Sequence, residues 1–376
     1  MKTILVIAFS DLAMDSRVHR QIRFLSERYR IIASGWKDPC VENVDFIPLP
    51  RVTPAQMIAL SPLLLFRQFE RYYWRQNAIV ECLRKLSRIR ADLVLANDIE
   101  TLPLALTLAQ GAKVILDAHE YAPRQVEDLF FWRVFFQKYK TYLCTTYIPK
   151  VDGMMTVSQG LAEMYGRDTG VKPIVITNAP DFEQIEPHWL DDREKPIRLV
   201  HHGKVSPSRK TENLIRLMDL LDDRFRLDLI LMEAWPGYIK RLQQLARRNE
   251  RIRFLPPVSM KRVSQHLNQY DIGVHLLKPV NFNFLHSLPN KLFEFVQARL
   301  AVAIGPSPEM ARIVRHFDLG VIAQDFSPEA MARCLIALDA ERINYYKSQS
   351  NRAARALSAV ENRATLLGLA EKVLGS

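Results

Sequence analysis

A short apolar run followed by an amphipathic stretch recurs along the chain, and this alternation limits the possible folds more than any other feature. Ile4–Phe9 is the first such run, and Val18, Ile22, Leu25 and Tyr29 follow it at helical spacing. Acidic residues come directly after this short run, so we interpret it as a strand and not as a signal peptide. Alternating strands and helices predict parallel sheets with right-handed crossovers.

The alternation falls into two blocks. The first block predicts a helix at Leu102–Leu108 and strands at Ile4–Phe9, Ile31–Ser34, Leu93–Ala96, Val114–Asp117, Met154–Val157 and Ile174–Thr177. The second predicts helices at Thr211–Leu221, Ile239–Arg247 and Met260–Gln269, and strands at Leu199–His201, Leu227–Met232, Ile252–Phe254, Ile272–Leu276 and Val302–Ile304. We therefore expect an α/β protein with two Rossmann-like, doubly wound domains that face a cleft.

A polar, acidic, proline-containing segment separates the blocks and sets the predicted boundaries. We expect a first domain at 1–182, a linker at 183–196 and a second domain at 197–350. The remaining residues, 351–376, predict a C-terminal helix that packs back on the first domain. Ligands of open α/β sheets bind at the carboxyl ends of strands, which makes the cleft the expected site.

Composition and motifs narrow the classes of function. Lys and Arg number 52 against 41 Asp and Glu, a net charge of +11 that favours anionic partners. The four cysteines are far apart and form no C-x-x-C, which argues against a zinc ribbon or a disulfide scaffold and favours a reducing compartment. Neither G-x-G-x-x-G nor a P-loop is present, so a Rossmann dehydrogenase and a P-loop NTPase are disfavoured.

Three segments carry residues suited to chemistry at strand ends and helix starts. Gly203, Lys204 and Arg209 follow a strand, where a diphosphate could lie near the next helix. Pro289–Glu294 opens a helix. Asp117–Glu120 ends a strand with three polar side chains. Each segment alone also fits a solvated loop or a structural histidine.

The order of these motifs resembles the family-4 retaining glycosyltransferases, which have the GT-B fold. The residues that carry this resemblance are Asp15–Val18, Asp92–Asp98, Asp117–Glu120, Val151–Ser158, Ile176–Asp181, Lys204 with Arg209, and Pro289–Glu294 with Ala298–Ile304. The family often has two glutamates eight residues apart, and His286 stands where the first would be. The glycine-rich turn usual after the family's first strand is replaced by Asp11–Met14.

The resemblance implies a site divided between the domains. On the donor side it implies Gly203, Lys204, Arg209, His286, Asn290, Lys291 and Glu294, with Glu294 on the nucleotide ribose. On the acceptor side it implies Asp15, Arg17, Asp98 and Glu120, and His119 is the candidate catalytic residue that shapes the acceptor and sugar pocket. No metal and no cofactor is expected, because the nucleotide-sugar is a substrate and the basic residues can neutralise its diphosphate.

The expected reaction moves a sugar from a nucleotide-sugar donor to an acceptor hydroxyl with retention, in polysaccharide or glycolipid assembly. The partners are then the donor, a glycan or lipid-linked acceptor and no nucleic acid. Two alternatives stay open: a nucleotide-sugar epimerase of the same fold, which needs no acceptor, and a non-catalytic GT-B scaffold, which binds no nucleotide.

Two segments of the first block mix aromatic and basic residues. They are 61–76, with Leu64, Phe66, Tyr72, Tyr73 and Trp74, and 129–148, with Phe130, Phe131, Trp132, Phe135 and Phe136. This composition is typical of an interfacial surface, although aromatic helices that fill their own core share it. It predicts a cytoplasmic protein that is peripheral on the inner, anionic face of the cell membrane.

Overall fold

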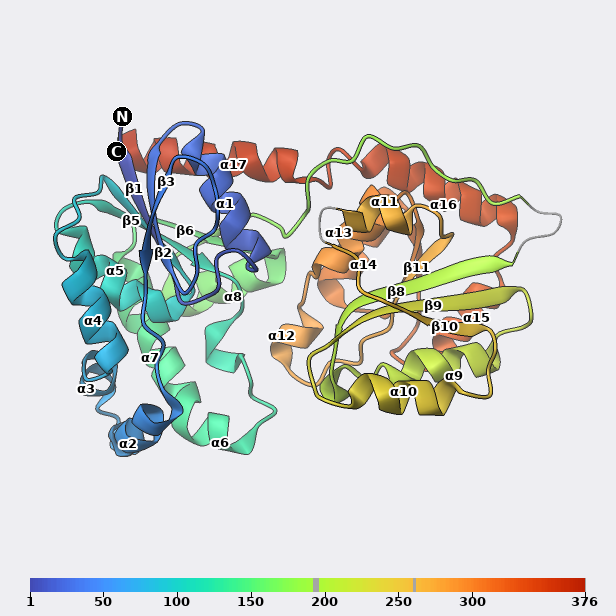
Figure 1. Cartoon of the computed structure of the whole chain (residues 1–376), viewed down its shortest axis with the longest axis horizontal. Helices are drawn as coiled ribbons and strands as arrows, with labels where there is room; N and C mark the ends of the chain where they lie inside the picture. The colour runs from blue at the N-terminus through green and yellow to red at the C-terminus, as the bar shows by residue number, and fades with distance from the viewer. Residues whose placement is uncertain (192–195, 260–261, 376) are drawn as a thin grey trace. The chain divides into compact units, whose positions relative to one another are not determined.

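The computed structural model describes residues 1–191, 196–259 and 262–375, which form two compact units (Figure 1). Unit 1 comprises Met1–Thr177, Asn281–Asn283 and the residues from Asn362 onward. Unit 2 comprises Asn178–Val280 and Phe284–Glu361. The first division therefore falls five residues before the predicted domain end at 182, and the chain returns to unit 1 at Asn362 and not at 351.

Unit 1 is built on a parallel sheet with the strand order β3-β2-β1-β4-β5-β6-β7. Its strands are β1 (Thr3–Ala8), β2 (Arg30–Gly35), β3 (Val44–Pro48), β4 (Leu93–Asn97), β5 (Lys113–Ala118), β6 (Gly153–Thr156) and β7 (Ile174–Val175). β1 pairs with both β2 and β4, with Ile4 opposite Ile31 and Leu93. The order reverses between β1 and β4, and this is the switch point at which doubly wound sheets bind ligands.

The helices of unit 1 include α1 (Ser16–Ser26), near the start of the chain, and most of α17 (Ala359–Gly375), near its end. Asp15 caps α1, because its side chain accepts from the backbone N–H groups of Arg17 and Val18. The other helices are α2 (Pro54–Leu65), α3 (Phe69–Trp74), α4 (Asn77–Leu86), α5 (Leu102–Ala109), α6 (Phe130–Trp132), the π-helical turn η3 (Arg133–Gln137), α7 (Lys138–Tyr147) and α8 (Gln159–Thr169).

Unit 2 repeats the doubly wound design with the order β10-β9-β8-β11-β12-β13. Its strands are β8 (Ile197–Val205), β9 (Phe225–Glu233), β10 (Ile252–Leu255), β11 (Ile272–His275), β12 (Ala301–Ile304) and β13 (Gly320–Ile322). Its helices are α9 (Glu212–Leu220), α10 (Tyr238–Ala246), α11 (Val263–Leu267), α13 (Asn290–Gln297), α14 (Pro308–Phe317), α15 (Pro328–Ile336) and α16 (Ala340–Ala353), and the short α12 (Phe282–Leu285) crosses a unit boundary. The switch point here lies between β8 and β11.

The predicted linker is part of unit 2 over its described residues. Arg299 donates from Nη2 to the carbonyl oxygen of Glu183 at 2.6 Å, and the backbone N–H of Leu190 donates to Asn344 at 2.9 Å. Leu190 is buried. The rest of the predicted linker includes 192–195, which lie outside the described residues, as do Met260 and Lys261 of the helix predicted at Met260–Gln269.

Two strands were missed, and both lie at sheet edges. β3 ends in a proline, which edge strands tolerate, and β13 has three residues, too few for a recognisable apolar run. Over the described ranges, no helix has the length and apolar character that a membrane crossing requires.

Candidate functional site

A buried ion pair forms the base of the site in unit 1. Asp117, at the end of β5, accepts from Arg17 at 2.6 Å (Nε) and 2.7 Å (Nη2), a bidentate arrangement. Both side chains are almost fully buried. Burial opposes ionisation of Asp117, but Arg17 and His119 outweigh it and hold the pKa of that carboxyl well below its usual range. Arg17 thus joins the first turn of α1 to β5.

His119 lies between two carboxylates. Its Nε2 is 3.1 Å from Asp117 Oδ2 and its Nδ1 is 3.4 Å from Asp98 Oδ2, while its backbone N–H donates to Asp98 Oδ1 at 3.0 Å. Burial disfavours the charged ring, but Asp98 and Asp117 outweigh burial and raise the pKa of His119 to about 9. At neutral pH the ring is therefore an imidazolium, which can donate hydrogen bonds but cannot act as a general base.

Asp98 has a strained backbone at the same place. Its φ of 63° and ψ of 158° fall in a region that is populated almost only by glycine. Such strain costs on the order of 1–3 kcal/mol and is found mostly at functional sites. The conformation presents the carboxylate to His119 and leaves 44% of the Asp98 side chain exposed.

These residues line a cavity of about 120 Å³ at the carboxyl ends of β1, β4 and β5. Its lining residues are Ala8, Phe9, Ser10, Asp15, Asn97, Asp98, Glu100 and His119. Two residues predicted for the acceptor side, Asp15 and Asp98, thus come together with the candidate catalytic residue His119 at the switch point of unit 1. We call this cavity the His119 pocket.

Two other predicted acceptor-side residues do not line the His119 pocket. Arg17 lies behind it on Asp117, and Glu120 has an exposed side chain and accepts from Tyr165 only through its backbone oxygen. Sequence reasoning missed Asn97, whose Oδ1 is 3.3 Å from His119 Nε2, and Ser10. Their position directly after β1 or at the end of β4 was the available signal.

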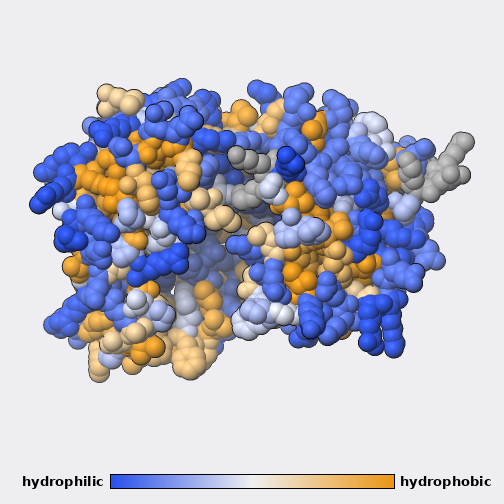
Figure 2. Space-filling view, viewed as in Figure 1, coloured by the Kyte–Doolittle hydropathy of each residue, from blue (hydrophilic) through white to orange (hydrophobic). Residues whose placement is uncertain are grey.

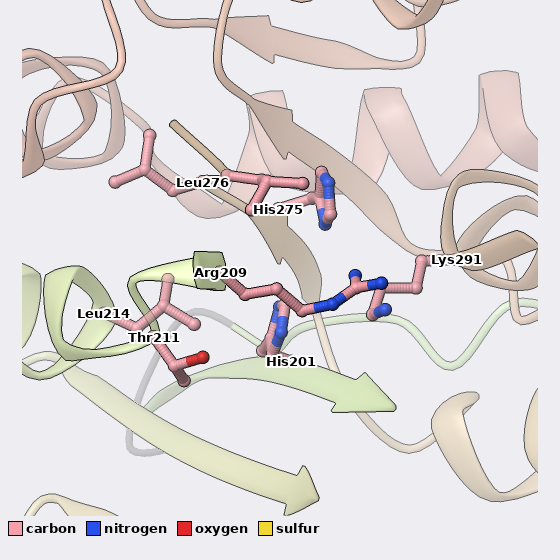
Figure 3. A pocket seen from close by; sticks show the side chains of 8 residues that line it. His201, Arg209, Thr211, Leu214, His275, Leu276 and Lys291 are labelled. Atoms are coloured by element: carbon pink, nitrogen blue, oxygen red, sulfur yellow. The ribbon is translucent and has the colours of Figure 1, made fainter. Parts of the chain in front are cut away.

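The site in unit 2 is cationic. Arg209 and Lys291 line one pocket with His201, Thr211, Leu214, His275, Leu276 and Leu277. The Arg209 and Lys291 side chains approach each other beside the two histidine rings (Figure 3). Thr211 and Lys291 stand at the first turns of α9 and α13, where helix dipoles favour negative charge. We call this place the Arg209–Lys291 pocket.

Three buried histidines surround the two cations and are uncharged. Burial and Lys291 lower the pKa of His201 to about 3, and they hold the pKa of His202 and His275 well below the usual value. His201 Nδ1 bonds to the Val274 carbonyl oxygen at 2.9 Å. Within the described residues, neither ring nitrogen of buried His275 has a hydrogen-bond partner. Such an orphaned polar group favours a bound ligand or water.

The Lys291 side chain packs closely against the backbone at Gly203. Gly203 has a φ of +107°, which favours glycine, and a Cβ there would lie 2.8 Å from the Lys291 Nζ and would displace the end of that side chain. Burial and Arg209 lower the pKa of Lys291 to about 8, although Glu294 opposes them. Glu294 lies 3.3 Å from His202 Nε2.

The other predicted donor residues are outside the Arg209–Lys291 pocket. Lys204 is exposed, Asn290 is the first residue of α13, and His286 lies 3.4 Å from Glu309. Sequence reasoning assigned no role to His201, His202 and His275; the His-His pair at the end of the predicted strand Leu199–His201 was the available signal. In the part of the chain that the structure describes, no cluster of His, Cys, Asp and Glu could hold a metal ion.

Comparisons with known proteins define the fold class. No family model and no curated protein sequence matches the chain. Among solved structures, Anabaena Alr3699/HepE in complex with UDP-glucose is similar over 99% of this chain and all of its own, with a TM-score of 0.72 and 13% identity. Sucrose-phosphate synthase from Thermosynechococcus elongatus is similar over the full length of both chains, with a TM-score of 0.70 and 13% identity.

A point mutant of S. aureus TarM, in complex with fondaparinux, alpha-GlcNAc-glycerol and UDP, matches 80% of this chain with a TM-score of 0.64 and 11% identity. The match spans 59% of the length of TarM. These similarities confirm the predicted fold class: two doubly wound α/β units of the GT-B type.

Proposed function

We propose that the chain is a glycosyltransferase that moves a sugar from a nucleotide-sugar donor to an acceptor hydroxyl. The observation that carries this proposal is the meeting of Arg209 and Lys291 at two helix N-termini, beside buried His275, whose ring nitrogens find no partner among the described residues. Charges and dipoles arranged in this way would stabilise a diphosphate as it leaves the sugar. HepE with UDP-glucose and TarM with UDP support a uridine diphosphate donor.

The residues of unit 2 would divide the donor between them. The enclosed part of the Arg209–Lys291 pocket is about 10 Å³, enough for one water-sized group, so one phosphate oxygen would enter it. Glu294 would accept from the ribose hydroxyls, and neutral His202 lies beside it. No metal is needed in this scheme, because Arg209 and Lys291 supply the positive charge.

The His119 pocket would bind the acceptor. The exposed Asp98 carboxylate would accept a hydrogen bond from a neighbouring hydroxyl of the acceptor, while the His119 imidazolium holds Asp98 in its strained conformation. Because His119 carries its proton, the departing phosphate would take the acceptor proton on the same face of the sugar. This scheme gives retention, as in the family-4 enzymes that the sequence resembles.

The test is turnover of UDP-glucose and of other UDP, GDP, ADP and CMP sugars with simple alcohols as acceptors. We expect nucleotide release that depends on the acceptor, with a product that keeps the anomeric configuration of the donor by NMR. Epimerised nucleotide-sugar formed without acceptor would indicate the epimerase instead. No rise in melting temperature with any of these nucleotides would indicate the scaffold.

We also propose that unit 1 attaches to anionic membranes through α2 and α6. Apolar side chains gather over these helices at the lower edge of unit 1 (Figure 2), and Ile58, Phe66, Phe130 and Phe131 are 65–75% exposed. The predicted surface needs correction, since Leu64, Tyr72 and Tyr73 are core residues. Trp74, Trp132, Phe135 and Phe136 are only partly exposed.

Liposome flotation tests the membrane proposal. We expect binding to vesicles with anionic lipids at low salt, since each basic residue near such a surface contributes about 1 kcal/mol. Arg67, Arg71 and Arg133 are exposed near the apolar residues. Phe130→Ser with Phe131→Ser should abolish flotation, while the matched pair Trp189→Ser with Trp235→Ser in unit 2 should not. Equal flotation of both double variants would contradict the assignment.

A further inference from the structure

We propose that a second, apolar pocket in unit 1 binds the hydrocarbon chain of an amphiphilic acceptor, an alkyl or prenyl lipid. This inference rests on the proposed function, because it names the class of acceptor. The pocket has a volume of about 360 Å³, within the usual range of ligand sites. It is lined by Phe9, Val52, Met57, Tyr72, Tyr73, Gln76, Ile79, Glu100, Gln125, Val126, Trp132, Phe136, Tyr139 and Lys140.

The lining of this apolar pocket favours hydrocarbon over a sugar or a nucleotide. Its walls are mainly aromatic and aliphatic, and the polar groups at its inner end are already paired. Lys140 is buried against Glu100, and the Tyr73 hydroxyl donates to the Glu100 carbonyl oxygen at 2.8 Å. Because Glu100 already neutralises Lys140, an anionic ligand would find no free positive charge in this pocket. An apolar chain needs no such partner and is stabilised by leaving water.

The apolar pocket adjoins the His119 pocket. Phe9, after β1, and Glu100, after β4, line both cavities. One cavity presents Asp15, Asp98 and His119, and the other presents aromatic rings. A ligand that fills both must therefore join a polar, hydroxyl-bearing head to an apolar tail.

The other end of the apolar pocket lies among the exposed apolar residues. Met57 of α2 lines the pocket and is 37% exposed, and the next residue, Ile58, is 73% exposed. Trp132 directly follows exposed Phe130 and Phe131 in α6, and Phe136 lies in the next element, η3. α2 also packs against η3. A chain could thus pass from the apolar surface into the pocket along Met57 and Trp132, which is why we assign a lipid and not an isolated aromatic ligand.

The experiment titrates the whole protein with n-alkyl β-D-glucosides, from methyl to decyl, by calorimetry at monomeric concentrations. Each added methylene that enters an apolar site should lower the dissociation constant about fourfold until the pocket is full. Val126→Trp, which fills the pocket, should abolish this dependence on chain length. Val134→Trp adds the same ring to exposed η3 outside the lining and should leave it intact.

The outcomes separate the pocket from the reaction. Affinity independent of chain length, or equal dependence in both variants, would overturn the apolar pocket as the chain's site. UDP binding is measured on the same samples and reports unit 2 alone. UDP binding without chain-length dependence would be consistent with the proposed function but would contradict the lipid site. Chain-length dependence without UDP binding would support the lipid site but would contradict the proposed function. Val52→Trp fills the pocket from another segment if Val126→Trp does not fold.

Discussion

The His119 pocket and the Arg209–Lys291 pocket occupy equivalent places in two similar sheets but hold histidines in opposite charge states. Each lies at a switch point, where the strand order reverses. Two carboxylates raise the pKa of His119 to about 9, whereas burial and Lys291 lower the pKa of His201 to about 3. The comparison shows that the fold fixes where a site forms, while the neighbours of each strand end fix its charge. In unit 1 the charges of the His119 network are paired with one another, whereas in unit 2 Arg209 and Lys291 form a cationic pocket suited to an anion.

The largest expected effect is on the network of unit 1. Asp117→Leu leaves the Arg17 guanidinium buried without its carboxylate, which should destabilise unit 1 by about 3–5 kcal/mol. Hydrogen exchange measures this unit by unit, and exchange in unit 2 should not change. The double variant Arg17→Met with Asp117→Leu removes both charges and should recover most of the loss. A mild effect of Asp117→Leu would show that the ion pair is not the base of the site.

Unit 1 should lose stability as pH rises, and unit 2 should lose stability as pH falls. The pKa of His119 is raised in the folded state, so its contribution is complete below about pH 6.5 and is lost as pH rises through about 9, at most about 3 kcal/mol. The pKa of His201, His202 and His275 is lowered, so unit 2 loses about 1.4 kcal/mol per pH unit for each histidine as pH falls below about 6.5.

Hydrogen exchange from pH 4.5 to 9 would show both limbs. His119→Asn should flatten the alkaline limb of unit 1, and His275→Leu should reduce the acid slope of unit 2. The same pH profile in both units would contradict the contrast between the two sites.

Much of this arrangement was predictable from the sequence, because strand ends can be located from apolar runs. Asp117 lies near the end of β5, His119 follows that strand, and Arg209 follows β8. The sequence could not show that the Arg17 guanidinium spans 100 residues to Asp117, nor that Arg209 meets Lys291 and His275, since such contacts depend on strand order and register. Composition likewise could not separate buried Tyr72 from exposed Phe66, because the chain turns at Arg67 with a φ of 55°.

The cations of unit 2 should differ in their effect on nucleotide affinity. Arg209→Ala and Lys291→Ala should each raise the Kd for UDP at least tenfold, since hydrogen bonds to charged groups contribute about 1.5–3 kcal/mol. Lys204→Ala is the matched control, because it removes an exposed charge near the end of β8, outside the pocket, and should change the Kd less than threefold. Calorimetry with UDP measures all three. An equal loss with Lys204→Ala would place the diphosphate along the exposed edge of β8 and not in the pocket.

The smallest expected effect is a pH dependence of UDP affinity that comes from Lys291 in unit 2 and not from His119 in unit 1. Burial and Arg209 lower the pKa of Lys291 to about 8, so this lysine loses its charge in the free protein as pH rises through that value. A bound diphosphate favours the charged form, and phosphate groups are already ionised at this pH. UDP affinity should therefore fall by up to about tenfold per pH unit above pH 8, with proton uptake on binding. Calorimetry in two buffers of different ionisation enthalpy detects that proton.

Two variants serve as controls. Lys291→Arg keeps its charge at every pH, so its UDP affinity should not change over the same range. His119→Asn should leave the slope unchanged, because His119 belongs to the other site. A slope that survives in Lys291→Arg would assign the proton to another group in unit 2.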